Sequence, residues 1–213
     1  MNRPNLSESV EKAYRSIREW ILDGTLEAGQ DLRESDLGAR IGVSRTPVRS
    51  ALSRLEAEGL VIYERYRRYT VAALTLQDID KIFELRVVLE GLAARRAATR
   101  IGAEDLAELR RLNAEMLDCA ETRSAQSTRR YDALNTAFHR IVLQAADNRR
   151  LETMLNGLID LPLSFLSEYQ PSLASHFRRS CQHHEEIIRA MEAGNAEWAA
   201  AQMQAHLQSV RVT

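Results

Sequence analysis

Arg45 and Arg49 are the first residues whose type and spacing could do chemistry. They are four residues apart, so in a helix they share one face, near its N-terminal end. An arginine guanidinium is a planar fork that can bind guanine O6 and N7, or a phosphate. Ser44 and Thr46 can donate hydrogen bonds to phosphate beside them. This set predicts electrostatic and hydrogen-bonding contacts with a nucleic acid, without catalysis.

The residues around the arginine pair predict two short helices joined by a tight turn. Leu37 and Ile41 supply the buried face of the first helix, Gly42 permits the turn, and Val43 closes the small core between the helices. Apolar residues at helical spacing would bury one side of the second helix, namely Val48, Leu52 and Leu55. In such a helix-turn-helix the second helix enters the major groove of DNA.

The second helix also carries start and stop signals. We expect the Ser44 hydroxyl to cap its first turn, where Pro47 is tolerated because no intrahelical donor is needed, and Gly59 to end it. A solvated helix whose arginines only keep it soluble is the alternative for the arginine pair alone. The complete pattern favours a helix that reads DNA.

Residues 60–72 form two short β-prone runs around a basic tip, which predicts a hairpin beside that helix, a wing. Arg65, Arg67 and Arg68 could reach a phosphate or the minor groove from it. The alternative is an edge hairpin that its charges protect from aggregation. The position directly after the second helix favours the wing.

Histidines form the second candidate site. Asn135 and His139 are four residues apart and share a helix face, while His184 and His206 lie on later predicted helices. Three imidazoles and an amide oxygen that converge inside a helical bundle could hold a divalent metal. Taken one at a time, a histidine is more often a surface or core residue than a ligand. His176 and His183 are expected to be such bystanders, and spacing alone does not decide for metal.

Arg86 is a further candidate, with two readings that the sequence leaves open. Its guanidinium could face a cavity and bind the carboxylate of an organic acid. It could equally form a surface ion pair with Glu90, four residues on, which would contribute little to stability.

The second half of the chain is predicted to be helical throughout. Leucine, alanine and isoleucine recur three and four residues apart, and glycine, proline, serine and asparagine separate the periodic segments. The predicted helices are 76–99, 103–121, 129–146, 149–169, 171–193 and 196–210. The fold class is therefore mainly α, with a winged helix-turn-helix domain at 1–74 and an all-α helical bundle at 75–213.

Composition is consistent with two modest domains and excludes some classes of protein. Of the 213 residues, 1–74 hold 12 basic and 11 acidic side chains, so affinity for DNA must come from a local basic face. Residues 75–213 hold 17 basic and 19 acidic side chains and are not built for nucleic acid. No apolar run is long enough to span a membrane or serve as a secretion signal, so we expect a cytoplasmic protein with no membrane partner. Cys119 and Cys181 are expected to be buried thiols, not a disulfide.

Residues 10–74 resemble the winged-helix domain of the GntR family of bacterial transcription regulators. The matching segments are 21–33, Gly42-Val-Ser-Arg-Thr-Pro-Val-Arg and Leu55-Glu-Ala-Glu-Gly-Leu-Val. The resemblance implies that Ser44, Arg45, Thr46 and Arg49 contact double-stranded operator DNA, that Arg33 contacts phosphate, and that a homodimer binds short palindromes. Family members usually carry a glycine at the wing tip, and Arg68 matches that position here.

Residues 75–213 are similar to the FCD domain, the effector-binding helical domain of the FadR subfamily, and closer to its shorter, six-helix VanR-like branch. The matching segments include Glu84-Leu-Arg-Val-Val-Leu-Glu, Asn135-Thr-Ala-Phe-His and Gln204-Ala-His-Leu. Many members hold zinc, nickel or manganese through one carboxylate and three histidines. The resemblance implies that His139, His184 and His206 are ligands, and that Asn135 stands where the carboxylate is usual. That change weakens metal binding and leaves the ion's charge for an anionic effector, or it marks a site that has lost its metal.

The function that follows is a regulator, most simply a repressor released from its operator by a small organic acid bound in the helical domain, with Arg86 and a metal as its contacts. A regulator that senses the metal itself is an alternative. A metal-dependent enzyme acting on an organic acid is a weaker one. Glu185 and Glu186 are the acidic neighbours of His184, but they lie on other faces of the predicted helix. No general base is therefore evident beside the histidines, and we do not expect the chain to be an enzyme.

Overall fold

A computed structural model describes residues 5–64, 68–73, 75–122, 124–155, 158–159 and 173–210. The chain divides into two compact units, Met1–Thr75 and Leu76–Thr213. The sequence analysis placed this boundary one residue earlier. Within the described residues, no helix is both long enough and apolar enough to cross a membrane.

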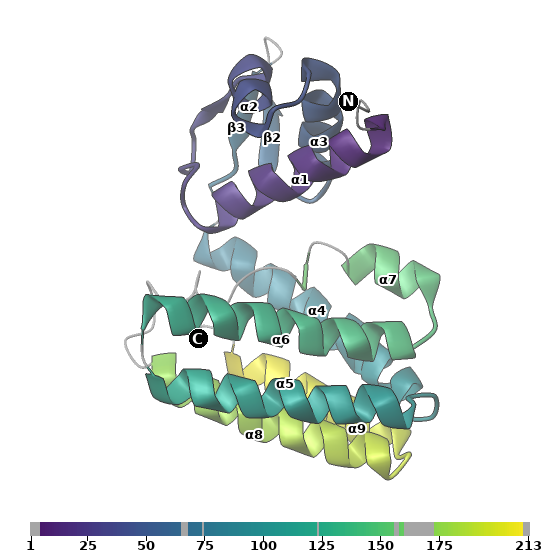
Figure 1. Ribbon diagram of the computed structural model, residues 1–213. Coiled ribbons are helices and arrows are strands. Elements are labelled where there is room, and N and C mark those ends of the chain that lie inside the picture. The colour runs from purple at the N-terminus through teal and green to yellow at the C-terminus, as the bar shows by residue number, and fades with distance from the viewer. Residues whose placement is uncertain are drawn as a thin grey trace. The chain divides into compact units, whose positions relative to one another are not determined.

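The N-terminal unit combines three helices with a small antiparallel sheet (Figure 1). Its core contains Ile17 from the first helix together with Val48, Leu52 and Leu55, none of which is exposed to solvent. The three strands are ordered β1-β3-β2. The elements are α1 (Leu6–Leu22), β1 (Asp31–Leu32), α2 (Glu34–Ile41), α3 (Arg45–Ala57), β2 (Val61–Glu64) and β3 (Arg68–Val71).

The turn between α2 and α3 depends on two glycines. Gly42 ends α2 in the left-handed conformation, with φ of 79°, which glycine adopts without steric cost. The backbone N–H groups of Gly42 and Val43 both donate to the carbonyl of Gly38. A Cβ on Gly38 would lie 2.8 Å from the carbonyl oxygen of Val43, so the turn passes directly over a residue without a side chain. Leu37 and Ile41 are buried as predicted.

The prediction that the Ser44 hydroxyl caps α3 is wrong. Ser44 occupies the N-cap position with an extended backbone, but its side chain makes no capping hydrogen bond. A capping side chain accepts from the N–H of the second or third helical residue. The third residue here is Pro47, which has no N–H.

The predicted hairpin is present, but Arg68 does not lie at its tip. It begins β3, opposite Glu64 of β2. Its guanidinium lies 3.2 Å from the Asp31 carboxylate and 3.5 Å from that of Glu64. Arg65 and Arg67, the other predicted wing contacts, lie outside the described residues.

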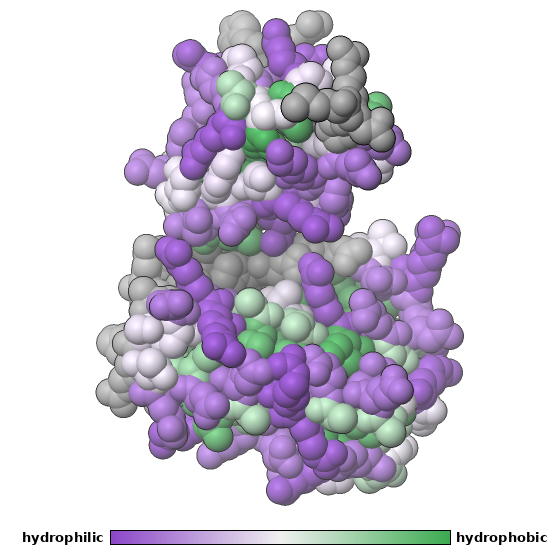
Figure 2. Space-filling model, in the orientation of Figure 1, coloured by the Kyte–Doolittle hydropathy of each residue, from purple (hydrophilic) through white to green (hydrophobic). Residues whose placement is uncertain are grey.

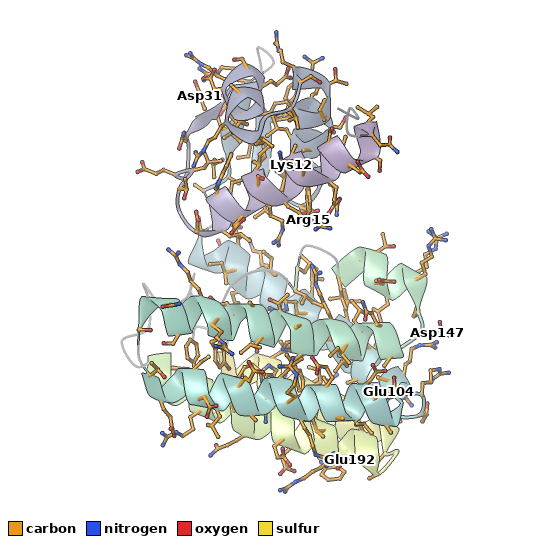
Figure 3. The ribbon with its side chains drawn as sticks, viewed as in Figure 1. Lys12, Arg15, Asp31, Glu104, Asp147 and Glu192 are labelled. Atoms are coloured by element: carbon orange, nitrogen blue, oxygen red, sulfur yellow. The ribbon has the colours of Figure 1, made fainter. Side chains whose placement is uncertain are left out.

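The C-terminal unit is helical in all its described elements, as predicted (Figure 1). Helices α4, α6, α8 and α9 each contribute side chains to a common interior, and α5 packs on α6 and α8. Charged and polar side chains cover most of the face formed by α5 and α6 (Figure 2). Acidic residues mark helix ends, with Glu104 at the start of α5 and Glu192 at the end of α8 (Figure 3). The elements are α4 (Leu76–Ala97), α5 (Ala103–Thr122), α6 (Ala125–Ala145), α7 (Arg149–Leu155), α8 (Leu173–Glu192) and α9 (Ala196–Val210).

Two predicted helix limits are wrong. Helix α6 begins at Ala125, four residues earlier than predicted, because Ser124 and Ser127 form a reciprocal capping box with hydrogen bonds of 3.0 and 2.8 Å. Helix α7 ends at Leu155 instead of continuing to 169. Leu158 and Ile159 lie in a turn, and their backbone N–H groups both donate to the carbonyl of Leu155. The rest of that predicted helix lies outside the described residues.

Gly38→Ala is expected to destabilise the N-terminal unit. Alanine at a helical glycine would ordinarily stabilise by about 1 kcal/mol. Here the new methyl group collides with the backbone of Val43, so we expect a net loss of roughly 1–3 kcal/mol. Urea denaturation measures the change. The control is Gly102→Ala, where a methyl group would meet no atom within 4 Å; equal effects of the two substitutions would contradict the clash.

Candidate functional sites

The side chains predicted to contact DNA lie on the exposed side of the helix-turn-helix. Arg45, Thr46 and Arg49 extend from the first turns of α3, and Ser44 precedes them; all four are exposed. Arg33 is also exposed, directly before α2. The opposite side of α3 is buried in the core of the unit, so these polar groups share the face left to solvent.

Glu34, the first residue of α2, lies against both arginines of α3. Arg49 donates to its carboxylate through Nε at 2.7 Å and Nη2 at 3.0 Å, and Arg45 Nε lies 3.5 Å away. The Glu34 side chain is 13% exposed, whereas those of Arg45 and Arg49 are 71% and 65% exposed. The hydrogen bond from Arg49 lowers the pKa of Glu34, so the carboxylate is ionised at neutral pH. The sequence analysis missed this contact, which spans fifteen residues.

In the helical unit, three histidines from three helices converge. His139 of α6, His184 of α8 and His206 of α9 offer ring nitrogens that all lie within 4.8 Å of one another. None of the three side chains is more than 2% exposed. His176 and His183 do not belong to this cluster.

Three of the six ring nitrogens of the cluster have no hydrogen-bond partner among the described residues. His139 Nε2 and His206 Nε2 are 3.2 Å apart. His184 stacks on Phe138, with ring centroids 4.0 Å apart, which fixes the orientation of its ring. Among the described residues, no group bonds either nitrogen of His184 or Nδ1 of His206. Buried polar atoms are nearly always bonded, so these nitrogens point to a ligand.

Glu90 completes the cluster from α4. Its carboxylate accepts from His139 Nδ1 at 2.5 Å and from Arg86 Nε at 2.6 Å, and both Glu90 and Arg86 are 2% exposed. Burial opposes ionisation of Glu90, but the charges of Arg86 and His139 and their hydrogen bonds outweigh it and lower the pKa of Glu90 to about 2. The bond to Glu90 holds the proton of His139 on Nδ1, which leaves Nε2 as the ligand atom.

Of the two alternatives for Arg86, the ion pair with Glu90 exists, but it is buried and does not lie on the surface. Sequence spacing shows that the two residues share a helix face and cannot show that α6 and α9 cover that face. The contact between Glu90 and His139, 49 residues apart, was not predicted.

Asn135 lies one helical turn before His139 on α6 and is 7% exposed. Its Oδ1 has no hydrogen-bond partner among the described residues. An unpartnered buried oxygen one helical turn from His139 can accept a hydrogen bond from a ligand or bind a cation.

The donor set fits a divalent transition metal. Two nitrogens bound to one tetrahedral ion at about 2.0–2.1 Å lie roughly 3.3 Å apart, close to the 3.2 Å between His139 Nε2 and His206 Nε2. A histidine must be neutral to bind metal. Burial lowers the pKa of His184 and of His206 well below the ordinary value, which keeps both rings neutral.

The acidic residues next to His184 do not enter this site. Glu185 and Glu186 are each about 40% exposed and pair with Arg189 at 3.3 and 3.1 Å. They lie on the outer side of α8, in agreement with their predicted orientation.

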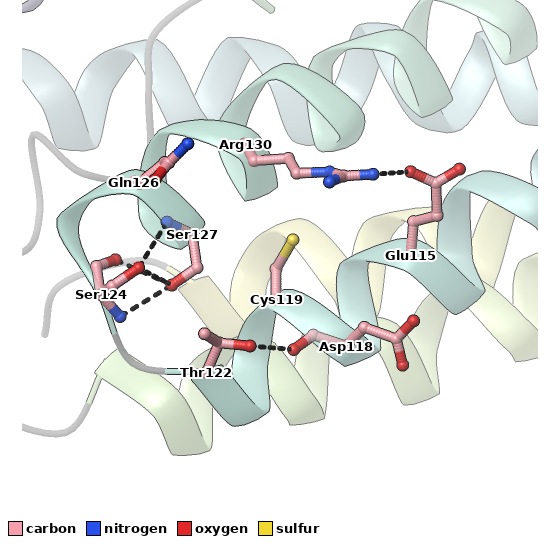
Figure 4. Close-up of a pocket in the computed structure, with 8 residues that line it drawn as sticks. All are labelled: Glu115, Asp118, Cys119, Thr122, Ser124, Gln126, Ser127 and Arg130. Carbon is pink, nitrogen blue, oxygen red and sulfur yellow. Dashed lines mark hydrogen bonds and ion pairs between the residues drawn. The ribbon is translucent and has the colours of Figure 1, made fainter.

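A separate hollow of about 260 Å³ lies between α5 and the start of α6 (Figure 4). Its polar groups largely bond one another: Arg130 pairs with Glu115 at 2.6 Å, and Ser124 bonds Ser127. Burial raises the pKa of the Cys119 thiol in its wall, so the thiol stays protonated. This hollow carries no unsatisfied group that calls for a ligand.

Comparison with known proteins identifies both units of the chain. Residues 9–71 match the model of the bacterial regulatory proteins of the gntR family, and residues 81–209 match the FCD domain. The chain belongs to the GntR family. It is therefore a DNA-binding transcription regulator with an N-terminal GntR helix-turn-helix domain and a C-terminal FCD domain.

Similar proteins include regulators of both signs. The chain is 31% identical to a probable D-xylose utilization operon transcriptional repressor of Paenarthrobacter nicotinovorans, over 84% of this chain and 76% of that protein. It is 32% identical to the Glc operon transcriptional activator of Escherichia coli K12, over 71% and 66%. Escherichia coli McbR/YncC shares the fold with a TM-score of 0.78 at 21% identity, over 97% of this chain and 95% of that one.

We expect the metal-free protein to lose stability as the pH falls below about 6.5. Burial lowers the folded-state pKa of His184 and His206, so below the pKa of an unfolded histidine, about 6.5, the unfolded chain binds more protons than the folded one. The free energy of unfolding then falls by up to about 1.4 kcal/mol per pH unit for each histidine. Urea denaturation of chelator-treated protein between about pH 7.5 and 5.5 checks this. Constant stability across that range would contradict the burial of neutral rings.

Proposed function

We propose that this GntR regulator is a repressor that a small carboxylate releases from its operator, and that the carboxylate binds in the FCD domain beside a divalent metal. The observation that carries the proposal is the convergence of His139, His184 and His206, in which no described residue bonds either ring nitrogen of His184 or Nδ1 of His206. The name of the D-xylose operon repressor supports the sign of regulation.

His139, His184 and His206 would hold the metal, and Asn135 would supply a neutral oxygen. Imidazole nitrogens suit zinc and nickel, whereas manganese favours carboxylates and water, so this donor set favours zinc or nickel. When bound, the ion is a Lewis acid that can take a ligand atom from an effector. Glu90 would orient His139 and increase its basicity through the Nδ1 contact.

The charges of the site favour an anionic effector. The buried negative charge of Glu90 is matched by Arg86 at 2.6 Å, the rings of His184 and His206 are neutral, and the Asn135 amide carries no charge. These groups therefore leave the charge of a divalent ion uncompensated, which favours a carboxylate ligand. Arg86 has five N–H donors and gives one of them, at Nε, to Glu90. We retain Arg86 as a candidate contact for the effector.

Control of DNA binding would follow from linkage between the two sites. An effector that binds more tightly to a dimer with its DNA-binding helices misplaced for the operator weakens operator binding by the same coupling free energy, typically about 1–3 kcal/mol. The regulator would act as a homodimer on a palindromic operator, with Arg33, Ser44, Arg45, Thr46 and Arg49 as contacts in each half-site.

A regulator that senses the metal itself is the second candidate. The observation that favours it is the burial of the whole donor set, since all three histidines are at most 2% exposed and an enclosed ion needs no further ligand to be retained. Metal that changes operator affinity without any organic ligand would favour sensing. A change that requires a carboxylate would favour the effector.

Arg49→Ala is expected to weaken operator binding at least tenfold, because α3 would lose a fork able to bind guanine or phosphate. The operator is first selected from random duplexes with the wild-type chain, and affinity is then measured by fluorescence anisotropy. Arg150→Ala, an exposed arginine of the helical unit, is the control for charge. Unchanged affinity of the Arg49 variant would rule out the recognition role of α3.

Wild-type protein purified without chelator is expected to contain about one transition-metal ion per chain, because the described residues form one cluster of three histidines. His139→Ala should lose the metal, since it removes a ligand and the partner of Glu90. Elemental analysis measures the content. His176→Ala, a histidine of α8 outside the cluster, should keep it, and equal metal in both variants would contradict the site.

A further inference from the structure

A carboxylate lies beneath the two arginines of the DNA-binding surface. Glu34 accepts two hydrogen bonds from Arg49 and lies 3.5 Å from Arg45, on a neighbouring helix. It is itself largely covered, while both arginines are about two-thirds exposed. The carboxylate of Glu34 is therefore covered by the two guanidinium groups, which remain accessible to solvent.

The two hydrogen bonds to Glu34 fix the orientation of the Arg49 guanidinium. A guanidinium has five N–H donors, of which Glu34 takes one on Nε and one on Nη2. Two donors on Nη1 and one on Nη2 remain, and together they can form the bidentate fork that reads guanine. Base recognition needs this fixed orientation, whereas phosphate binding does not, because any cation near the backbone neutralises a phosphate.

The Glu34 carboxylate also reduces the net positive charge of the surface. Glu34 brings the net charge of the three side chains from +2 to +1. Binding to non-operator DNA comes almost entirely from charge neutralisation, so it loses affinity, while an oriented base contact is kept.

A purely structural role explains the contact poorly. Exposed ion pairs typically contribute about 0.2–1 kcal/mol, and both arginines are exposed. Helices α2 and α3 are already joined by the Gly38–Val43 turn and by the apolar core. The pair is thus not needed to hold the two helices together.

We propose that Glu34 is a specificity-determining residue, which orients Arg49 and Arg45 toward the bases and restrains them from binding phosphate on non-operator DNA. This inference rests on the proposed contacts of Arg45 and Arg49 with the operator.

The test compares Glu34→Gln with wild type on two duplexes, the selected operator and a random sequence, over a range of salt concentrations. Glutamine keeps the size of the side chain and removes its charge. We expect random-duplex binding to strengthen and its log–log salt slope to steepen by about 1, as for one added phosphate contact. We expect the ratio of operator to random affinity to fall at least tenfold.

Glu27→Gln removes the same charge from an exposed loop residue of the same unit, and it should leave the ratio and the slope as in wild type. Thermal unfolding of both variants monitors folding. A ratio for Glu34→Gln within twofold of wild type would overturn the inference, as would equal loss of operator and random binding with a lower unfolding midpoint. If Arg49→Ala binds the operator normally, the proposed contacts themselves fail; if only the Glu34 ratio is unchanged, this inference alone fails.

Discussion

The need to pair buried polar groups organises the helical unit. An unpaired charge or donor inside a protein costs several kcal/mol, so Arg86, Glu90 and His139 are held as a connected set across α4 and α6. Removing any one member would leave another unsatisfied. The same rule identifies the candidate site, because the nitrogens of His184 and His206 and the Asn135 oxygen are buried beside this set without protein partners. These are the atoms of the site with which a ligand could form contacts.

In each unit a carboxylate bonds a cationic or imidazole group and orients it. One of these carboxylates is buried in the helical interior, and the other lies at the surface of the DNA-binding unit. In the helical unit Glu90 is buried, accepts a hydrogen bond from His139 Nδ1 and balances the charge of Arg86. In the DNA-binding unit Glu34 is largely covered and pairs with two exposed arginines, so it holds them and lowers the net positive charge of that surface. Each carboxylate sets the geometry of the groups that bond it.

Local pattern was sufficient for the helix-turn-helix and for most helix positions. Leu37, Ile41 and Gly42 act within one turn of each other, so their spacing predicts the structure directly. The predicted cap by Ser44 is absent. The prediction relied on serine as a typical N-cap residue and did not consider that Pro47 has no N–H to donate. The spacing of Asn135 and His139 predicts one shared face, but convergence with His184 and His206 depends on how α6, α8 and α9 pack, and the resemblance to a family supplied that. The contacts of Glu34 with Arg49 and of Glu90 with His139 were missed because each joins residues on two different helices.

X-ray absorption spectroscopy of the zinc-loaded protein tests the central claim most directly, because it reports the atoms around the ion. The account predicts nitrogen or oxygen neighbours at about 2.0–2.1 Å, with the multiple scattering of about three imidazoles and no sulfur. A sulfur neighbour near 2.3 Å, a shell of oxygen alone, or a protein that retains no zinc would contradict the histidine site and, with it, a metal at the effector pocket.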